Sequence, residues 1–315
     1  MDILGLLVFP GLVFLFALAW FYEWLDRRFF ARLQNRYGPI YTGSHGLLQP
    51  VADFIKLLAK EDIEPAAADK PLFRCVPILI LTLPLTALFL IPMNGVKAFV
   101  NFEGDLIFII FIISLIAILA FLGGWSSTNR FSTLGGLRAA IQTLGYEVPL
   151  AIVLVGPAIA ARSLSISKIV EWQATNGLWI ITLAPIGFGI AIFAMLAELE
   201  KVPFDIPEAE TEIVAGWQTE FSGRKLALLR LALDFELLLA ASLISALFLG
   251  GSSGPIAMIP GIVWFLIKTT LVVLILSNLR ALFARFKIDQ MVSGSWKFLV
   301  PLAILQIVIL QLLLR

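Results

Sequence analysis

Seven carboxylates lie within the 24 residues AELEKVPFDIPEAETEIVAGWQTE, positions 197–220, beside a single lysine; we call this stretch the acidic segment. They are Glu198, Glu200, Asp205, Glu208, Glu210, Glu212 and Glu220. Carboxylates this close together cannot all ionise cheaply, so we expect them to titrate as a coupled group. Glu208 and Glu212 are four residues apart and would share one face of a helix, where repulsion favours protonation of one of them. Such a group is suited to relaying protons or to binding a cation.

Four further ionisable residues stand in or at the edge of strongly apolar stretches: Glu147, Asp234, Glu236 and Lys268. A charge inside a membrane costs about 2.5–3.5 kcal/mol on insertion scales, so each of them needs a partner or a purpose. Pro149 lacks a backbone donor and would open a polar notch beside Glu147. Lys268 is expected either to pair with a carboxylate or to lose its proton. The plainer alternatives are a structural hydrogen bond for Glu147 and simple access to the membrane surface for Glu200 and Asp234.

Membrane-spanning helices have to position these residues. The chain has 315 residues, 60% hydrophobic and 14% charged, with a mean hydropathy of +0.96, which is more apolar than a soluble core of this size requires. Runs of about twenty apolar residues predict an all-α polytopic membrane protein with about eight transmembrane helices. These are centred on 3–24, 72–92, 105–122, 136–160, 178–199, 228–249, 256–280 and 297–313. The first run lacks the basic start and cleavage site of a signal peptide, so we expect it to be retained.

The basic residues predict the orientation of the chain. Eighteen lysines and arginines fall in or beside the connections after the first, third, fifth and seventh spans, whereas four fall on the other side. Because cytoplasmic loops carry the excess of positive charge, both termini are expected on the outer face of a multi-pass plasma-membrane protein. We expect one transmembrane domain over residues 1–315, with long cytoplasmic loops at 25–71 and 200–227.

Both long loops have apolar faces. In the first, LLQPVADFIKLLAKED has apolar residues at helical spacing, which predicts an amphipathic helix on the membrane surface or under a partner. In the second, the acids alternate with apolar residues such as Phe204 and Trp217, and Pro203 and Pro207 indicate a fixed path. A charged run is usually a solvated surface. Here the apolar residues favour a loop that lines a buried polar cavity.

The sequence has none of the usual cofactor patterns. It contains no CxxC, HExxH, CxxCH, P-loop or strand-linked GxGxxG motif, and its only cysteine, Cys75, cannot form an internal disulfide. We therefore expect this chain to bind no metal and no redox cofactor of its own. Nothing in the sequence indicates a nucleic-acid partner.

Five stretches resemble, in order, the complex I membrane subunit that faces the peripheral arm, called subunit 1 or the H subunit. They are DRRFFARLQNRYGP (26–39), GLLQPVADFIKLLAKEDIEPAAADK (46–70), GGWSSTNRFSTLGGLRAAIQTLGYEVPL (123–150), AELEKVPFDIPEAETEIVAGWQTEFSG (197–223) and DQMVSGSWKFLVPL (289–302). The resemblance implies about eight transmembrane helices at the junction of the two arms, a share in the quinone cavity, and the start of a proton path toward antiporter-like subunits. Similar subunits occur in membrane-bound hydrogenases, sulfur-reducing complexes and ferredoxin-dependent dehydrogenases.

The resemblance also implies roles for residues. Glu147 matches the glutamate of the family's YEV, and Glu198 matches that of its AE motif. Together with the intramembrane residues above, the expected proton path comprises Glu147, Glu198, Asp205, Glu208, Glu210, Glu212, Glu220, Asp234, Glu236 and Lys268. Arg27, Arg36 and Asp53 match polar positions near the arm junction, where Phe204 and Trp217 are expected in the cavity wall.

Two departures bear on the electron acceptor. Quinone-reducing members commonly read GPNRVGP where this chain has GPIYTGSHG, which contains its only histidine, His45. Many of them have LAEY after the SG where this chain has LALDFE, so Leu233 replaces the expected glutamate. These differences keep the hydrogenase and sulfur-reductase branch open beside the quinone-reducing branch. His45 could pass protons near neutral pH or could be an ordinary loop residue.

The expected function is that of a cofactor-free membrane subunit of an ion-pumping oxidoreductase, not catalytic by itself. Its partners would be the iron–sulfur and large hydrogenase-like subunits of the peripheral arm, antiporter-like membrane subunits and the lipid bilayer. Iron–sulfur clusters and any nickel–iron centre would belong to those partners, and a quinone could bind at the interface. The alternative is a stand-alone proton- or cation-coupled secondary transporter, which midplane acids and interrupted spans also fit. A purely structural anchor would leave Glu147 and Lys268 unexplained.

Overall fold

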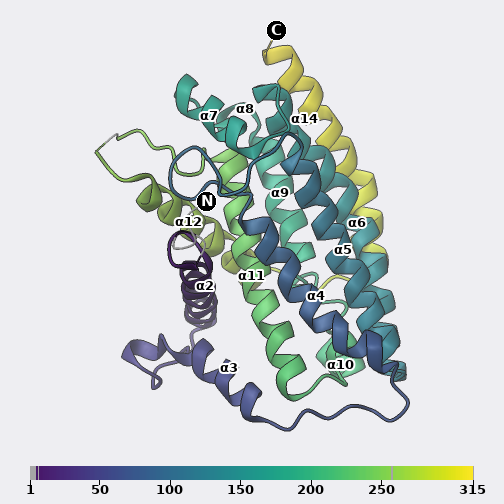
Figure 1. Cartoon of the computed structure of the whole chain (residues 1–315). Helices are drawn as coiled ribbons and strands as arrows, with labels where there is room; N and C mark the ends of the chain where they lie inside the picture. The colour runs from purple at the N-terminus through teal and green to yellow at the C-terminus, as the bar shows by residue number, and fades with distance from the viewer. Residues whose placement is uncertain (1–4, 6, 257, 315) are drawn as a thin grey trace.

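The computed structural model describes residues 5, 7–256 and 258–314, without the side chain of Glu210. Every regular element in this part of the chain is helical (Figure 1). In chain order they are α2 (Leu12–Leu33), α3 (Gln49–Ala59), α4 (Lys70–Leu88), α5 (Asp105–Ser126), α6 (Arg130–Ala161), α7 (Ile166–Asn176), α8 (Ile180–Leu183), α9 (Pro185–Glu198), α10 (Glu210–Ile213), α11 (Gly223–Phe248), α12 (Gly261–Leu282), α13 (Ile288–Gly294) and α14 (Val300–Leu313). Short 3₁₀ turns lie at Ser44–Gly46 and Gly216–Gln218, and a π-helical turn, Ser295–Leu299, joins α13 to α14.

Six helical segments of the described chain are long and apolar enough to cross a membrane: α4, α5, α6, α11, α12 and the continuous run Ile288–Leu313. They correspond to the second, third, fourth, sixth, seventh and eighth expected spans. An all-helical membrane protein is therefore confirmed. α6 continues through Pro149 and Pro157 as one helix of 32 residues.

The first and fifth expected spans differ from the prediction. α2 begins later than the run 3–24 and carries five charged residues in its second half, so it is not apolar enough to be counted with the other six. The early part of that run includes residues outside the described ones. The fifth run contains α8 and the 14-residue α9, with a break at Ala184 between them. Eight spans, and the placement of both termini on the outer face, therefore stay predictions.

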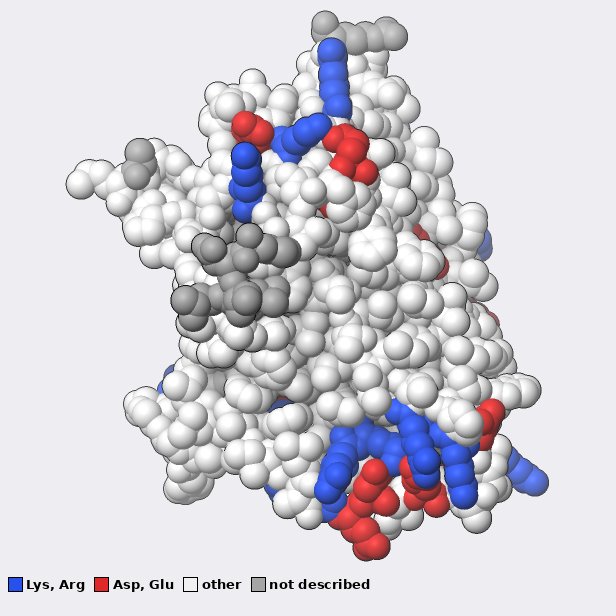
Figure 2. Space-filling model, viewed as in Figure 1, with Lys and Arg blue, Asp and Glu red and all other residues white. Residues whose placement is uncertain are grey.

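Charged side chains gather at two opposite ends of the face in Figure 2, with a broad band of uncharged surface between them. The end that carries α3 and α10 lies opposite the end that carries α7 and the last turns of α14 (Figure 1). An uncharged belt between two polar ends suits a bilayer. The two long loops thus lie at one end of the molecule.

The core is built around α11, which is buried along most of its length between α2, α4 and α12. Phe235 and Phe248 on this helix are fully buried. At the end of the molecule that carries α10, Phe221 stacks on Phe73 of α4, with ring centroids 4.3 Å apart, and Trp217 meets Phe221 edge to face. These rings fix the acidic segment against the helical bundle.

Two glycines hold the acidic segment close to its neighbours. A Cβ on Gly135 of α6 would lie 2.4 Å from the backbone nitrogen of Trp217. Gly216 has a φ of +55°, and a Cβ there would lie 1.8 Å from the carbonyl oxygen of Pro207. Only glycine fits at such approaches. The segment is therefore folded on itself and seated directly on α6.

Candidate functional site

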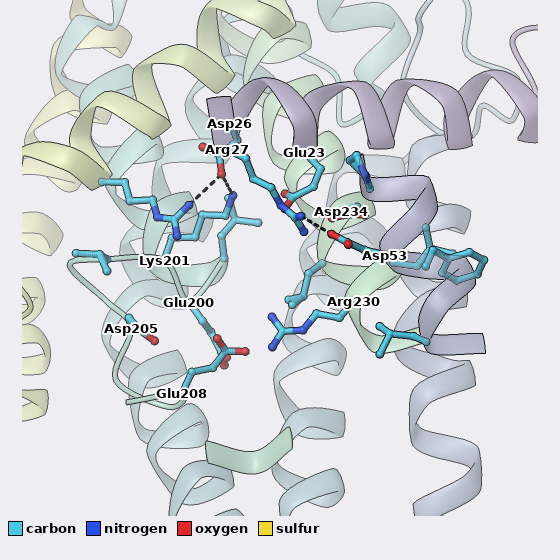
Figure 3. Close-up of a pocket in the computed structure, with 18 of the residues that line it drawn as sticks. Glu23, Asp26, Arg27, Asp53, Glu200, Lys201, Asp205, Glu208, Arg230 and Asp234 are labelled. Atoms are coloured by element: carbon cyan, nitrogen blue, oxygen red, sulfur yellow. Dashed lines mark hydrogen bonds and ion pairs between the residues drawn. The ribbon is translucent and has the colours of Figure 1, made fainter. Parts of the chain in front are cut away.

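The acidic segment forms one wall of a cavity of about 470 Å³ (Figure 3). α2 and α3 form two other sides, α11 forms the facing wall, and Arg280 of α12 reaches in from beside α2. Thirteen of its twenty lining residues are charged. The lining residues are Glu23, Asp26, Arg27, Pro50, Asp53, Phe54, Lys56, Leu57, Lys60, Leu199, Glu200, Lys201, Val202, Asp205, Glu208, Arg230, Leu231, Leu233, Asp234 and Arg280.

Asp26 is the most buried charge of this cavity, with 2% of its surface exposed. It accepts hydrogen bonds from Lys201 Nζ at 2.7 Å, from Arg280 Nη1 at 3.1 Å and from the hydroxyl of Ser277. Arg280 also lies over the ring of Phe30, 4.3 Å from its centroid. One carboxylate thus binds two cations and ties α2 to α12 and to the start of the acidic segment.

Arg27 makes a second ionic group on the next residue of α2. Its Nη1 donates to Asp53 of α3 at 2.7 Å, and its Nε donates to Glu23. Gln49 Nε2 holds the other oxygen of Asp53 at 2.8 Å. This group fixes the amphipathic helix α3 across the cavity from the acidic segment (Figure 3). Arg27 and Asp53, both expected at the arm junction, are therefore brought into one site.

The acidic wall holds Glu200, Asp205 and Glu208, and Figure 3 shows Glu200 and Glu208 facing Arg230 on α11. Gln218 Nε2 donates to Glu208 at 2.7 Å, and the indole of Trp217 donates to Glu200 at 3.3 Å. Burial raises the pKa of Glu200 to about 8, helped by the negative charges of Glu208 and Asp205. This carboxyl is therefore mostly protonated at neutral pH and can release its proton in response to a nearby positive charge.

A second, smaller hollow of about 30 Å³ lies behind Glu200, deeper among the helices. Its polar lining includes Gln142, Thr143 and Tyr146 of α6, Glu198 of α9 and Glu236 of α11, together with Trp217. Glu198 and Glu236 are buried, with 8% and 4% of their surfaces exposed. Glu200 lines both the large cavity and this hollow. A series of carboxylates thus leads from the cavity into the transmembrane bundle.

Three predicted path residues lie outside these two spaces. Glu147 on α6 accepts a hydrogen bond from Ser114 of α5. Glu220 accepts one from the side-chain amide of Asn129. Glu212 is half exposed and binds Arg138 Nη1 at 2.7 Å and Arg285 Nη2 at 2.6 Å, and the two guanidiniums lower the pKa of its carboxyl. Glu212 therefore anchors the acidic segment, since it is held as the anion.

Other predicted residues are placed elsewhere or not described. Lys268, expected to meet a carboxylate or titrate, donates to the carbonyl oxygens of Gly251 and Ser253 and lies over the ring of Trp179, which suits the carbonyl-rich end of α11. Arg36 is exposed, bonds Gln34 at 2.9 Å and lines neither space. The side chain of Glu210 lies outside the described residues. Phe204 is buried beneath the cavity wall, 5.7 Å from the ring of Phe286.

His45 lies in a 3₁₀ turn with a φ of +55°, and its backbone carbonyl accepts the indole hydrogen of Trp24 at 3.1 Å. It does not line the cavity. In the described chain no group of three or more His, Cys, Asp or Glu side chains is placed to hold a metal ion.

Several cavity residues carried no distinct signal in the sequence. Asp26 and Glu23 sit in the charged second half of the first apolar run, and Lys201 and Arg280 entered the sequence analysis only as topology markers. Their roles depend on α2, α12 and the acidic segment meeting in space. Arg230 could have been suspected as a cation one turn before Asp234 on a helix that is otherwise apolar.

Comparison with known proteins gives a consistent match. The family model described as NADH dehydrogenase matches residues 6–311. The chain is 37% identical over 307 residues to H subunit 2 of the NADH-quinone oxidoreductase of Syntrophobacter fumaroxidans, covering 95% of this chain and 92% of that protein. It is 40% identical over 291 residues to the H subunit of the NADH-quinone oxidoreductase of Bacillus thuringiensis and of Bacillus cereus, covering 91% of this chain and 87% of each.

Proposed function

Because this chain belongs to the NADH dehydrogenase family, as a member of the group that contains subunit 1 of complex I, we propose that it couples redox chemistry in neighbouring subunits to proton movement in the membrane. The observation that carries the proposal is that Glu200 lines both the cavity at the end of the bundle and the hollow inside it. One carboxyl thus connects Asp205 and Glu208 to Glu198 and Glu236.

The residues of the chain supply the proton handling. Glu200 holds a proton at neutral pH because it is buried beside other carboxylates. A change of charge in a docked redox partner alters the field at this carboxyl and moves the proton inward, toward Glu198 and Glu236, or outward, toward Glu208. The paired cations on Asp26 and Arg27 hold the walls in place and are not free to follow the proton.

Docking of the peripheral arm is proposed for the end that carries α3 and α10. The cavity is lined by residues of α3 and the acidic segment at this end, and the ion pairs of Asp53 and Glu212 fix both loops to the bundle. Purification of the native protein in mild detergent tests this: iron–sulfur subunits should co-purify at a fixed ratio. A chain that runs alone or only with copies of itself would favour a secondary transporter.

The identity of the acceptor rests on a specific feature of the cavity. An isoprenoid quinone needs an apolar channel for its tail. Here thirteen of the twenty lining residues are charged, and Leu233 stands where many quinone-reducing members have glutamate. The names of the relatives favour quinone, whereas this lining favours the hydrogenase or sulfur-reductase branch. The large subunit that co-purifies distinguishes the two, because a hydrogenase carries its own metal-binding cysteines.

The proton path is tested on Glu147, which lies on α6 next to Tyr146 of the hollow. Glu147→Gln keeps the hydrogen bond from Ser114 possible and removes the charge. We expect the complex to assemble and transfer electrons, with reduced ion pumping in proteoliposomes. Normal pumping by this variant would remove Glu147 from the path.

A further inference from the structure

Two buried acceptor oxygens share the small hollow among the carboxylates. Gln142 is 1% exposed and Glu236 4% exposed. Both line the hollow of about 30 Å³ between α6, α9 and α11. Among the described residues, neither Gln142 Oε1 nor Glu236 Oε1 has a hydrogen-bond partner. Buried polar atoms in native proteins almost always have a partner.

The amide of Gln142 is oriented by its other end. Its Nε2 donates to the backbone carbonyl of Ala197 at 2.7 Å, one residue before Glu198. Since only the nitrogen of an amide donates, this bond fixes Oε1 as the remaining, acceptor atom. Two acceptors cannot bond to each other, so they need a donor between them.

The hollow is large enough for that donor to be water. A bound water needs roughly 10–15 Å³ of such space and two to four polar partners. The hollow is larger than this, and its lining supplies Gln142, Glu198, Glu200 and Glu236. A hydroxyl from a neighbouring residue could satisfy one oxygen, whereas a water molecule has two hydrogens and can satisfy both.

We propose that Gln142 and Glu236 hold a water molecule in this hollow, and that Gln142 positions it to pass protons between Glu198 and Glu236. The role in proton transfer rests on the proposed function above. In one step the carboxylic acid of Glu198 gives its proton to the water, and the water gives one of its own to the carboxylate of Glu236. Glu198 becomes the anion, Glu236 becomes the acid, and the water is regenerated. Gln142 keeps its charge and protons throughout, so it is a positioning residue.

A matched glutamine provides the control. Gln173 of α7 is also 1% exposed, and its amide donates to the carbonyl oxygens of Ala246 and Leu247. Its Oε1 accepts the backbone N–H of Ile180 at 3.1 Å, and it lines neither the cavity nor the hollow. Gln142→Leu and Gln173→Leu therefore remove comparable buried hydrogen bonds to helix carbonyls, but only the first removes an oxygen that faces the carboxylates.

The experiment uses the intact complex in lipid nanodiscs. A cryo-EM map that resolves ordered water should show density within hydrogen-bond distance of Gln142 Oε1 and Glu236 Oε1. This density should be lost in Gln142→Leu and kept in Gln173→Leu. Gln142→Glu is the rescue, because a neutral glutamic acid keeps one acceptor oxygen and can donate to Ala197 in place of the amide. No density in the native complex, or density that survives in Gln142→Leu, would overturn the water site.

Pumping in proteoliposomes tests the role of the water separately. We expect Gln142→Leu to slow proton pumping about a hundredfold, the lower end of what a positioned proton-transfer group contributes. Gln142→Glu should restore pumping, and Gln173→Leu should leave it unchanged. If the water is lost in Gln142→Leu and pumping stays normal, the site stands while its part in proton transfer, and this branch of the proposed path, is refuted. Equal losses in both leucine variants would show a structural role only.

Discussion

Replacing Glu200 by glutamine is the most direct perturbation of the site. The carboxyl has a pKa raised from 4.5 to about 8, first by burial and then by Glu208. It is therefore about nine-tenths protonated at pH 7 and about nine-tenths ionised at pH 9. Infrared difference spectra between these pH values should show loss of a protonated-carboxyl stretch, with a midpoint near pH 8. Glu200→Gln should remove this band.

Two further variants make the measurement specific. Glu208→Gln removes the largest nearby negative charge, so the midpoint should move below pH 8. Glu212→Gln serves as the control, because Arg138 and Arg285 lower the pKa of Glu212 and it is already ionised throughout this range. A band that titrates near pH 4 to 5, or that remains in Glu200→Gln, would refute a proton held on Glu200 at neutral pH.

The same shift predicts how stability depends on pH. The folded chain keeps the Glu200 proton up to about pH 8, whereas the unfolded chain releases it near pH 4.5. The free energy of unfolding should therefore fall as pH rises through this window, by up to about 5 kcal/mol, less where cavity solvent screens the charge. In thermal unfolding at several pH values, Glu200→Gln should reduce this slope.

Three other substitutions test the surrounding structure by thermal unfolding or titration. Asp26→Asn leaves Lys201 and Arg280 without their buried anion and should destabilise the protein by about 3–5 kcal/mol, whereas Asp62→Asn, at an ion pair with Lys225 nearer the surface, should cost within about 1 kcal/mol; equal effects would contradict a central role for Asp26. Gly135→Ala places a methyl group 2.4 Å from the Trp217 nitrogen and should cost about 1–3 kcal/mol, whereas Gly156→Ala on the same helix meets no atom within 4 Å and should be neutral or slightly stabilising. A harmless Gly135→Ala would mean that the acidic segment is not seated tightly on α6. Trp217→Phe removes the indole hydrogen bond that lowers the pKa of Glu200, so the infrared midpoint should rise above pH 8; Trp125→Phe, at an exposed position, should not move it.

The sequence predicted the helical membrane fold because long apolar runs have few alternative structures. It failed at the ends of this pattern for a physical reason. α2 mixes an apolar half with five charges whose partners lie on other elements, and α9 is too short to be recognised by length. Hydropathy reports how greasy a segment is, and it does not report which neighbours neutralise its charges.

The same limit applied to the site. The cluster 197–220 was visible as a run of acids, and the structure places Asp205 and Glu208 on the cavity wall and Glu198 in the hollow. Glu212 belongs to the same run but binds two arginines at the surface. Spacing along the chain could not separate these cases, because the cations come from α6 and from the connection after α12. Asp26 was missed since only the fold shows that two cations converge on it.

The close fit of the acidic segment has a consequence for how quickly the site can respond. The carbonyl of Pro207 lies against Gly216, and the backbone at Trp217 lies against Gly135, so this backbone has no slack in which to swing. A signal that had to bend the segment would be limited to the microseconds or longer of loop and domain motion. Here a redox partner can act on carboxylates that stay where they are, and the information that crosses the interface is an electric field.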